Sequence, residues 1–140
     1  MDLYLKDIQS FYSSCPKSMR DLLGPRNIFN KSEYRYVIKD RHNNLYAFIE
    51  AKLISGNTEL YYNIGFKNKK YCQVNILNEL FSNLDSSIYI MREYITTYGT
   101  DLQFQQLLQV IGFVPIADRN IILQKHLIND ASHINYMRGR

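Results

Sequence analysis

One stretch of the chain, residues 62–74, has the strand, turn and helix order of a phosphate-binding site; it reads YNIGFKNKKYCQV. The pattern predicts an apolar strand that runs into the basic segment 67–70 and then into a helix. Such a turn attracts phosphate because backbone N–H groups and the helix dipole both favour an anion. No glycine follows Gly65 in this turn, so two interpretations stay open. Either Lys69 and Lys70 hold a phosphate by side-chain charge, or the segment is an ordinary surface turn.

Glu50 is the carboxylate best placed for proton transfer, since it lies within a predicted central strand. Phe48 and Lys52 share its strand face, and an apolar setting raises the pKa of a carboxyl group toward the range that a general base needs. In the alternative, this strand face is solvated and Glu50 pairs with Lys52 or Lys39. Glu59 opens the next strand and is expected to be exposed.

Three tyrosines are candidates for lining a groove that holds an acceptor or a cofactor: Tyr61, Tyr62 and Tyr71. A tyrosine packs its ring while it keeps a polar tip, which suits a binding surface. Ordinary packing on a sheet face is the competing interpretation of the same residues.

The histidines and cysteines give no sign of a metal or redox site. His42, His126 and His133 fall in a turn, a terminal strand and the tail, without the spacing of metal ligands. Cys15 and Cys72 match no metal or redox motif either, and we expect two buried free thiols in a reducing compartment. We assign none of these residues a catalytic role.

Apolar periodicity predicts the elements that must position these side chains. A helical repeat ends near Cys15, and a second short helix follows between Pro16 and Gly24. The period then changes to two, which predicts a meander of three strands joined by the polar turns 40–44 and 55–58. The later elements are a helix over about 71–84, a strand over 86–95, a helix that ends at Gly112 and a strand over 114–127.

The order α-α-β-β-β-α-β-α-β predicts an α/β fold, with a mixed, mostly antiparallel central sheet and helices on both faces. A chain of 140 residues suits a single domain. We assign this domain to residues 1–127 and expect the polar segment 128–140 to be a frayed tail. The net charge of +4 favours an anionic partner, or reflects no more than solubility. No apolar run reaches the roughly 20 residues of a membrane span, so we expect no membrane partner and a cytoplasmic location.

Three segments together resemble the GCN5-related N-acetyltransferase (GNAT) superfamily, over about residues 34–127. Residues 34–53, YRYVIKDRHNNLYAFIEAKL, are similar to its central hairpin, and residues 59–66, ELYYNIGF, are similar to its fourth strand. Residues 107–116, LLQVIGFVPI, are similar to its late helix and the closing hairpin that follows. The resemblance implies that the fourth strand splays from the fifth, that a pantetheine arm pairs with the exposed backbone, and that phosphates bind at the following turn.

The chain departs from the superfamily at three places. The resemblance puts the phosphate turn at 68–73, where Tyr71 and Gln73 occupy the positions of two glycines; their side chains would crowd a phosphate held by the backbone. Leu108 stands where many members have a tyrosine proposed to protonate the leaving thiolate, and Tyr98 is the candidate to replace it. The superfamily also begins with a strand, whereas this chain is predicted to begin with helices.

The resemblance implies a divergent acyl-CoA-dependent N-acetyltransferase that transfers an acetyl group to an unidentified amine. We expect acetyl-CoA as the cofactor, and Glu50 and Tyr98 as the catalytic residues. The expected cofactor-binding residues are Ile64, Phe66, Lys69, Lys70, Gln73 and Val74.

Two alternatives stay open. The missing glycines and tyrosine also fit the same fold with catalysis lost, acting as a binding or inhibitory module on another protein or on a second copy of the chain. A basic and aromatic surface would instead fit a small domain that binds single-stranded nucleic acid. Its basic members would be Lys67, Lys69, Lys70, Arg92, Arg119 and Lys125. No nucleic-acid-binding motif accompanies them, so this is the least favoured hypothesis.

Overall fold

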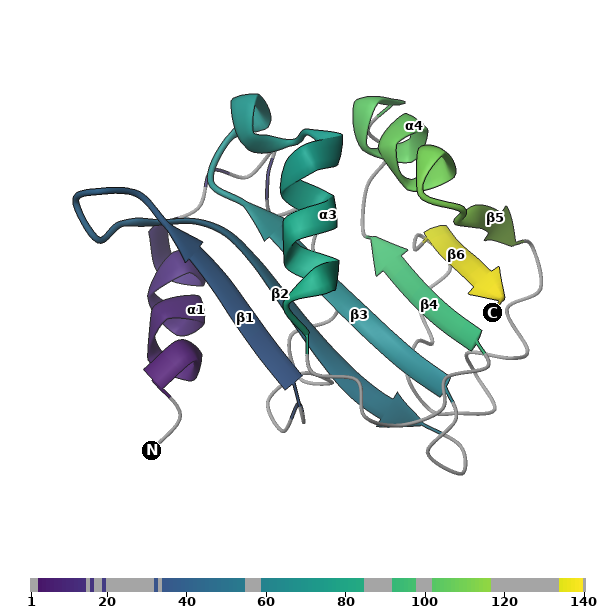
Figure 1. Cartoon of the computed structure of the whole chain (residues 1–140), viewed down its shortest axis with the longest axis horizontal. Coiled ribbons are helices and arrows are strands. Elements are labelled where there is room, and N and C mark those ends of the chain that lie inside the picture. The colour runs from purple at the N-terminus through teal and green to yellow at the C-terminus, as the bar shows by residue number, and fades with distance from the viewer. Residues whose placement is uncertain are drawn as a thin grey trace.

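A mixed sheet with helices on both faces is the centre of the fold (Figure 1). The computed structural model describes residues 3–14, 16, 19, 32, 34–54, 59–84, 92–97, 102–116 and 134–139. The strands within these residues are β1 (Tyr34–Lys39), β2 (Leu45–Ile54), β3 (Glu59–Phe66), β4 (Arg92–Thr97), β5 (Val114–Ile116) and β6 (Ile134–Gly139). Their order is β1-β2-β3-β4-β6-β5, and each neighbouring pair is antiparallel except the parallel pair β3 and β4. This arrangement confirms the predicted fold class.

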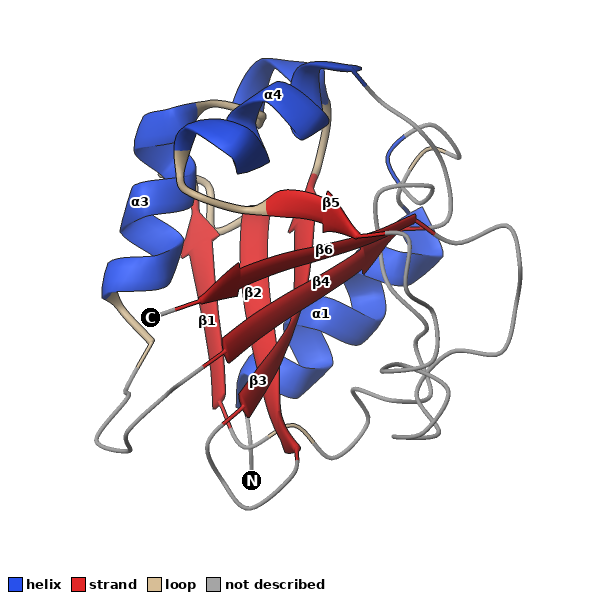
Figure 2. Ribbon diagram, turned by 90° about the vertical axis from the view of Figure 1, so that its right-hand side faces the viewer, coloured by secondary structure: helices blue, strands red, loops and turns tan. Residues whose placement is uncertain are grey.

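Different helices cover the two faces of the sheet, as Figure 1 and Figure 2 show. The helices are α1 (Leu3–Ser14), the 3₁₀ turn η2 (Lys69–Tyr71), α3 (Val74–Ser82) and α4 (Leu102–Val110). On the α1 face, the Phe11 ring meets the Phe48 ring edge-on at 5.1 Å. On the α3 and α4 face, the Phe81 ring meets the Tyr62 ring edge-on at 5.0 Å. Because strand side chains alternate between faces, the register of β2 with β3 puts Phe48 and Tyr62 on opposite sides.

Asp40 fixes the turn between β1 and β2. Its Oδ1 accepts hydrogen bonds from the backbone N–H groups of His42 and Asn44, at 2.8 and 3.0 Å. The hydrogen bond from Asn44 is the main cause of a pKa for Asp40 below its usual 3.8. Asn43 has a φ of 66°, in the left-handed region that asparagine tolerates better than most residues. The backbone of this turn is therefore held by its own hydrogen bonds.

Gly112 ends α4, as the sequence predicted. It has a φ of 103°, which glycine adopts without a steric penalty. The N–H of Phe113 donates to the carbonyl of Leu108 at 2.8 Å, and the N–H of Gly112 donates to the carbonyl of Gln109 at 3.1 Å. This is the hydrogen-bond pattern of a Schellman C-cap, and it brings the Phe113 side chain into the core, fully buried.

Several predicted boundaries are wrong. Residues 134–139, expected in a frayed tail, form β6 and pair with both β4 and β5. The helix expected from about residue 71 begins at Val74, because η2 occupies the preceding turn. β4 continues to Thr97, past the predicted strand end at residue 95. The second predicted helix and most of the strand expected over 114–127 lie outside the described residues.

Candidate functional site

β3 and β4 pair over only part of their lengths. Their ladder joins residues 59–62 to residues 92–95. Residues 63–66 of β3 pair with β2 and with no other described strand, while β4 continues alongside β6. Figure 1 shows the C-terminal ends of the two strands moving apart, and we call residues 63–66 the strand opening. An open strand edge of this kind offers main-chain N–H and C=O groups to an extended ligand.

Gly65, within the strand opening, is required by the packing on the α1 face. A Cβ at this position would lie 2.7 Å from Cζ and 2.9 Å from Cδ1 of Phe48. Phe48 is fully buried, and its ring packs against the rings of Phe11 and Tyr12. The glycine that the sequence shows just before the basic turn therefore has a structural reason.

The segment that follows the opening, 67–73, is a tight hydrogen-bonded turn. The Asn68 Oδ1 accepts from the N–H of Lys70, and the Asn68 carbonyl accepts from the N–H of Tyr71, both at 3.1 Å. The next two N–H groups donate to carbonyls inside the same turn. The backbone donors of residues 70–73 are therefore all in use, so they cannot also cradle a phosphate in this conformation.

Further backbone donors lie in the first turn of α3. Its first intrahelical hydrogen bond runs from the N–H of Leu77 to the carbonyl of Gln73, at 3.1 Å. The N–H groups of residues 74–76 thus have no partner within the helix. Gln73 makes no side-chain capping hydrogen bond, and its Nε2 donates instead to the carbonyl of Lys70 at 2.6 Å. This helix end carries partial positive charge, and the exposed Lys69 lies just before it.

The predicted cofactor-binding residues fall into two groups. Lys69, Lys70, Gln73 and Val74 lie together, exposed, at the turn and at the start of α3. Ile64 and Phe66 lie in the strand opening, but their side chains are buried on the α3 and α4 face; the Phe66 ring packs against Phe104 at 6.0 Å. These two residues can meet a ligand only through their backbone.

The tyrosines mainly pack, as the competing interpretation held. Tyr61 and Tyr62 are buried, so they line no open groove with their rings. Tyr71 is half-buried and stacks on Tyr46 with the ring centroids 4.6 Å apart. The Lys70 Nζ lies 5.0 Å from the centroid of the Tyr71 ring, so this aromatic pair helps to orient one of the two lysines.

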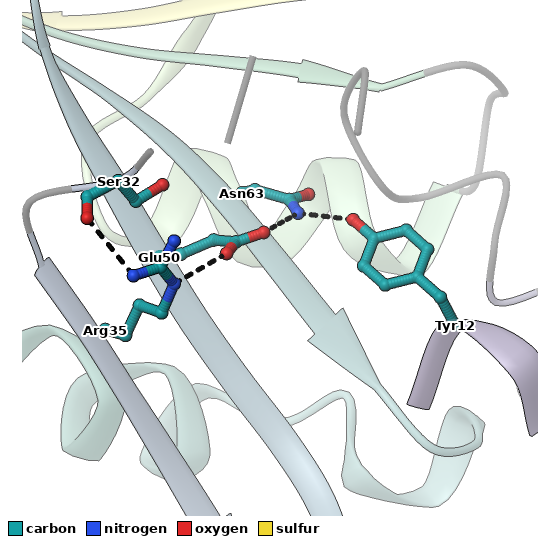
Figure 3. A network of polar contacts seen from close by, with 5 residues as sticks. All are labelled: Tyr12, Ser32, Arg35, Glu50 and Asn63. Atoms are coloured by element: carbon teal, nitrogen blue, oxygen red, sulfur yellow. Dashed lines mark hydrogen bonds and ion pairs between the residues drawn. The ribbon is translucent and has the colours of Figure 1, made fainter. Parts of the chain in front are cut away.

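Glu50 lies within a buried polar network on the α1 face (Figure 3). Its Oε2 lies 3.4 Å from the Arg35 Nε, and its Oε1 accepts a hydrogen bond from the Asn63 Nδ2 at 2.8 Å. The same Asn63 nitrogen donates to the Tyr12 hydroxyl at 2.6 Å. Arg35 also donates to the Ser32 carbonyl at 3.2 Å. The network thus connects β1, β2 and α1 to Asn63, the first residue of the strand opening.

This network changes the interpretation of Glu50. A solvated strand face with Lys52 or Lys39 as the partner is wrong, since Glu50 is 0% exposed and pairs with Arg35. Lys39 binds Asp7 instead, at 3.0 Å. An enclosed carboxylate with these contacts is well suited to hold the Asn63 amide in one orientation. The role of Glu50 as a base stays a prediction.

Glu59 is also buried, which corrects the expectation that it is exposed. It is 8% exposed, and its Oε2 accepts a hydrogen bond from the Tyr94 hydroxyl at 2.7 Å. Burial and this hydrogen bond raise the pKa of Tyr94 to about 12. The pair therefore keeps the Tyr94 phenol neutral, and it lies at the end of β3 opposite to the strand opening.

A second buried polar cluster lies on the other face, beneath α3 and α4. Glu93 is 0% exposed; one carboxylate oxygen accepts from the Tyr62 hydroxyl at 2.6 Å, and the other pairs with the Arg138 Nε. Arg138 also donates to the Ile111 carbonyl at 2.7 Å, and its guanidinium lies 5.0 and 4.5 Å from two phenylalanine ring centroids. Tyr62 is the last residue of β3 that pairs with β4, so this cluster braces the point where the strands part.

The other residues that the sequence singled out do not extend this site. Cys72 is a buried free thiol, as predicted, and Tyr98 lies outside the described residues. Lys67 follows the C-terminal end of β3, whereas Arg92 lies opposite the residue that begins β3. These two members of the predicted basic surface are therefore at different ends of the sheet. Arg119, Lys125, Cys15, His126 and His133 also lie outside the described residues.

Two kinds of feature are missing from the described part of the chain. None of its His, Cys, Asp and Glu side chains form a group of three or more that could hold a metal ion. None of its helices is long and apolar enough to cross a membrane.

Known acetyltransferase structures share the fold of this chain, although no family model and no curated protein matches it. A GNAT-family acetyltransferase from Staphylococcus aureus Mu50 has a TM-score of 0.66 at 18% identity, over 99% of this chain and 94% of that one. A GNAT-superfamily phosphinothricin acetyltransferase from Sinorhizobium meliloti, in complex with AcCoA, has a TM-score of 0.62 at 11% identity, over 99% and 86%. A spermidine N-acetyltransferase variant from Vibrio cholerae has a TM-score of 0.54 at 14% identity, over 81% and 69%. The chain therefore has the GNAT-superfamily fold.

Proposed function

We propose that this chain is an acyl-CoA-dependent N-acyltransferase that transfers an acetyl group to an amine. The observation that carries the proposal is the strand opening, which leads directly into a basic turn and the N-terminus of α3. An open strand edge beside a positively polarised helix end suits a ligand with an amide-bearing arm and phosphates. The shared fold with acetyltransferases, one of them in complex with AcCoA, supports the same conclusion.

In this proposal the chain binds the pyrophosphate of acetyl-CoA at the start of α3 instead of at the backbone of the preceding turn. The backbone of the strand opening would pair with the pantetheine arm. The pyrophosphate would lie at the start of α3, held by the N–H groups of 74–76 and by the side chains of Lys69 and Lys70. The N–H groups of 70–73 would take no part, because they are in use within the turn. When bound, acetyl-CoA supplies the activated thioester.

Proton transfer would use residues on the α1 face. The ammonium form of an acceptor must lose a proton to a base or to a water chain before it can react. We propose that Glu50 acts indirectly, because its carboxylate is enclosed and contacts Arg35 and Asn63. It would orient the Asn63 amide and, through it, the Tyr12 hydroxyl beside the strand opening. Tyr98 stays the proposed proton donor to the leaving thiolate.

A binding module with the same fold and no catalysis is the second candidate. The hydrogen bonds within the turn favour this module, because the N–H groups of residues 70–73 are already in use and cannot cradle a phosphate. Leu108 favours it as well, since this residue is fully buried and has no group that could protonate a thiolate.

Binding of acetyl-CoA and CoA tests the proposal. A ligand that binds the folded state raises the melting temperature by mass action, and calorimetry gives the affinity directly. Replacing Lys69 and Lys70 together by alanine should weaken binding about tenfold or more, since two charged contacts of about 1 kcal/mol each would be lost. Lys6→Ala on α1 is the matched control, because Lys6 is exposed and belongs neither to this turn nor to the start of α3.

The outcomes separate the two candidates. If neither acetyl-CoA nor CoA binds at millimolar concentration, the acyltransferase proposal is refuted. If acetyl-CoA binds, release of the free thiol is followed with a panel of amines that includes spermidine and phosphinothricin. Turnover with any of them supports the enzyme, whereas tight binding without turnover favours the module.

A further inference from the structure

A pocket of about 470 Å³ lies on the α1 side of the sheet and shares no lining residue with the strand opening. α1, the β1–β2 turn and the residues just after β3 form its walls. Its polar lining includes Asp7, Ser10, Ser14, Asn43, Asn44 and Lys67. This volume is within the range of roughly 300–1,000 Å³ that is typical of small-molecule sites. The proposed acyl transfer gives this pocket no role.

The wall from α1 is rich in hydrogen-bond acceptors. Asp7, Ser10 and Ser14 are three and four residues apart, so they share one face of the helix. The Asp7 Oδ2 binds the Lys39 Nζ at 3.0 Å, with both side chains about a third exposed, at 31% and 30%. Within the described residues, the Asp7 Oδ1 has no partner. The Ser14 hydroxyl donates to the Ser10 carbonyl at 3.2 Å, which leaves its oxygen able to accept.

The opposite wall is rich in donors and is held in place. The backbone of Asn43 and Asn44 is tied to Asp40, so the two side-chain amides start from a fixed turn. The N–H of Lys67 donates to the Tyr46 carbonyl at 2.9 Å, which fixes the Lys67 backbone beside this turn. In the part of the chain that the structure describes, Lys67 has no ion pair, and the side chains of Asn43 and Asn44 have no hydrogen bond.

The charges around the pocket balance. Lys39 compensates Asp7, and Lys67 lies close enough to Asp40 to help lower the pKa of that carboxyl group. The pocket therefore favours a ligand with opposite charges at its two ends over a ligand with a large net charge. A neutral sugar binds best against an exposed aromatic ring, but Phe11, the one aromatic side chain among the described residues that line the pocket, is 5% exposed.

We propose that this pocket binds a small zwitterion of the α-amino acid type. Its carboxylate would meet Lys67 and the amides of Asn43 and Asn44, and its ammonium group would meet Asp7, with Ser10 and Ser14 beside it. The site does not depend on the acyltransferase proposal. No residue of the strand opening lines it, and the two residues of the following turn that do, Lys67 and Asn68, are not proposed to contact acetyl-CoA.

Two-dimensional ¹⁵N NMR of the full chain tests this site directly. Pools of the standard L-amino acids are added, and the backbone amide signals of Asn43, Asn44 and Lys67 are followed. We expect at least one amino acid to shift these signals in a saturable way. Its N-acetyl derivative lacks the ammonium charge and its carboxamide lacks the carboxylate, so each should bind about tenfold more weakly, as expected for one lost charged hydrogen bond. The proposal is overturned if no pool shifts these signals. It is also overturned if either derivative, or myo-inositol, binds as tightly as the free amino acid.

Substitutions then place the ligand. Asp7→Asn and Lys67→Met should each weaken binding of the amino acid found above, again about tenfold. Lys6→Met is the matched control, since Lys6 neighbours Asp7 in sequence and does not line the pocket. All three side chains lie at the surface, so circular dichroism should show a folded protein in each case. Unchanged affinity in both pocket variants would put the ligand elsewhere and refute the assignment.

Discussion

Arg138→Met should destabilise the protein far more than a typical surface substitution. The change removes the positive charge that faces Glu93, and Glu93 is 0% exposed. Methionine fills much of the space of the arginine stem, so packing is largely kept and the loss reports on the polar contacts. The variant therefore measures what the buried cluster at Tyr62, Glu93 and Arg138 contributes to the free energy of unfolding.

The size of the effect follows from the contacts of Arg138. Removing one partner of a buried ion pair typically costs about 3–5 kcal/mol, because the other charge is left without compensation. The hydrogen bond to the Ile111 carbonyl, at 2.7 Å, adds about 1.5–3 kcal/mol as a charged bond. Each ring contact adds about 0.5–1 kcal/mol, since the Arg138 side chain is 21% exposed. These contributions overlap, so we expect a total loss of about 4 kcal/mol.

Urea denaturation followed by circular dichroism gives the free energy of unfolding of each variant. The double variant Glu93→Gln/Arg138→Met should recover about 2 kcal/mol of the loss, because no buried charge is left and the glutamine can still accept from Tyr62. Arg41→Met in the exposed β1–β2 turn is the matched control; it should change the stability by no more than about 0.5 kcal/mol.

Two results would refute this reasoning. One is a loss below about 1 kcal/mol for Arg138→Met, which is the size expected of an exposed ion pair. The other is a double variant as unstable as the single one, which would mean that the charge of Glu93 is not what makes Arg138 necessary.

Two further predictions concern β3 and its neighbours. Gly65→Ala should destabilise the protein by about 1–3 kcal/mol in urea denaturation, because the new Cβ would lie 2.7 Å from Cζ of the enclosed Phe48 ring. Adding Phe48→Leu should restore part of the lost stability. If Gly65→Ala leaves the free energy of unfolding unchanged, the Phe48 ring can move aside and the reasoning is wrong. The pKa of Tyr94 is raised from 10.0 to about 12, so folding favours the neutral phenol, and this contribution is complete below pH 10 and is lost as the pH rises to 12. The free energy of unfolding of the wild type should therefore fall more steeply across that window than that of Tyr94→Phe; equal slopes would contradict the raised pKa.

The strand pairing in the first half of the sheet could be predicted, because β1, β2 and β3 are consecutive in the chain and are joined by short polar turns. The polar turn 40–44 sets an antiparallel hairpin, and that hairpin puts residue 35 opposite residue 50. The contact of Arg35 with Glu50 was therefore within reach of the sequence, although it was missed. The sequence left two interpretations of Glu50 open, an apolar setting or a solvated strand face with Lys52 or Lys39 as the partner, and neither included Arg35.

The contacts of Asn63 and Glu93 could not be predicted in the same way. Asn63 meets Tyr12, which is 51 residues away in the chain, and nothing local signals where α1 packs on the sheet. Glu93 meets Arg138 of β6, a short strand in a polar segment. The pairing of β6 with β4 is decided by partners that lie 37 (Thr97↔Ile134) to 47 (Arg92↔Gly139) residues earlier in the sequence, rather than by its own pattern.

The backbone hydrogen bonds within the basic turn also could not be predicted from the sequence. Tyr71 and Gln73 were expected to obstruct a phosphate with their side chains. The structure gives a different reason for the missing cradle, because Asn68 begins a 3₁₀ turn that takes up the backbone donors itself. The nearest free helix donors are then displaced to the start of α3, which only the hydrogen-bond geometry reveals.

The position of β6 has a consequence for how the chain folds during synthesis. β6 lies between β4 and β5, so β4 has its full antiparallel partner only after residue 139 has left the ribosome. Until then the edge of β4 that pairs with β6 has no other strand partner among the described residues, and open strand edges pair readily with other chains. The hairpins of β1, β2 and β3 can form early, because their contacts are local. A chaperone that shields β4 should therefore matter most for the last part of translation, and a stop codon placed before residue 134 should yield an aggregating product.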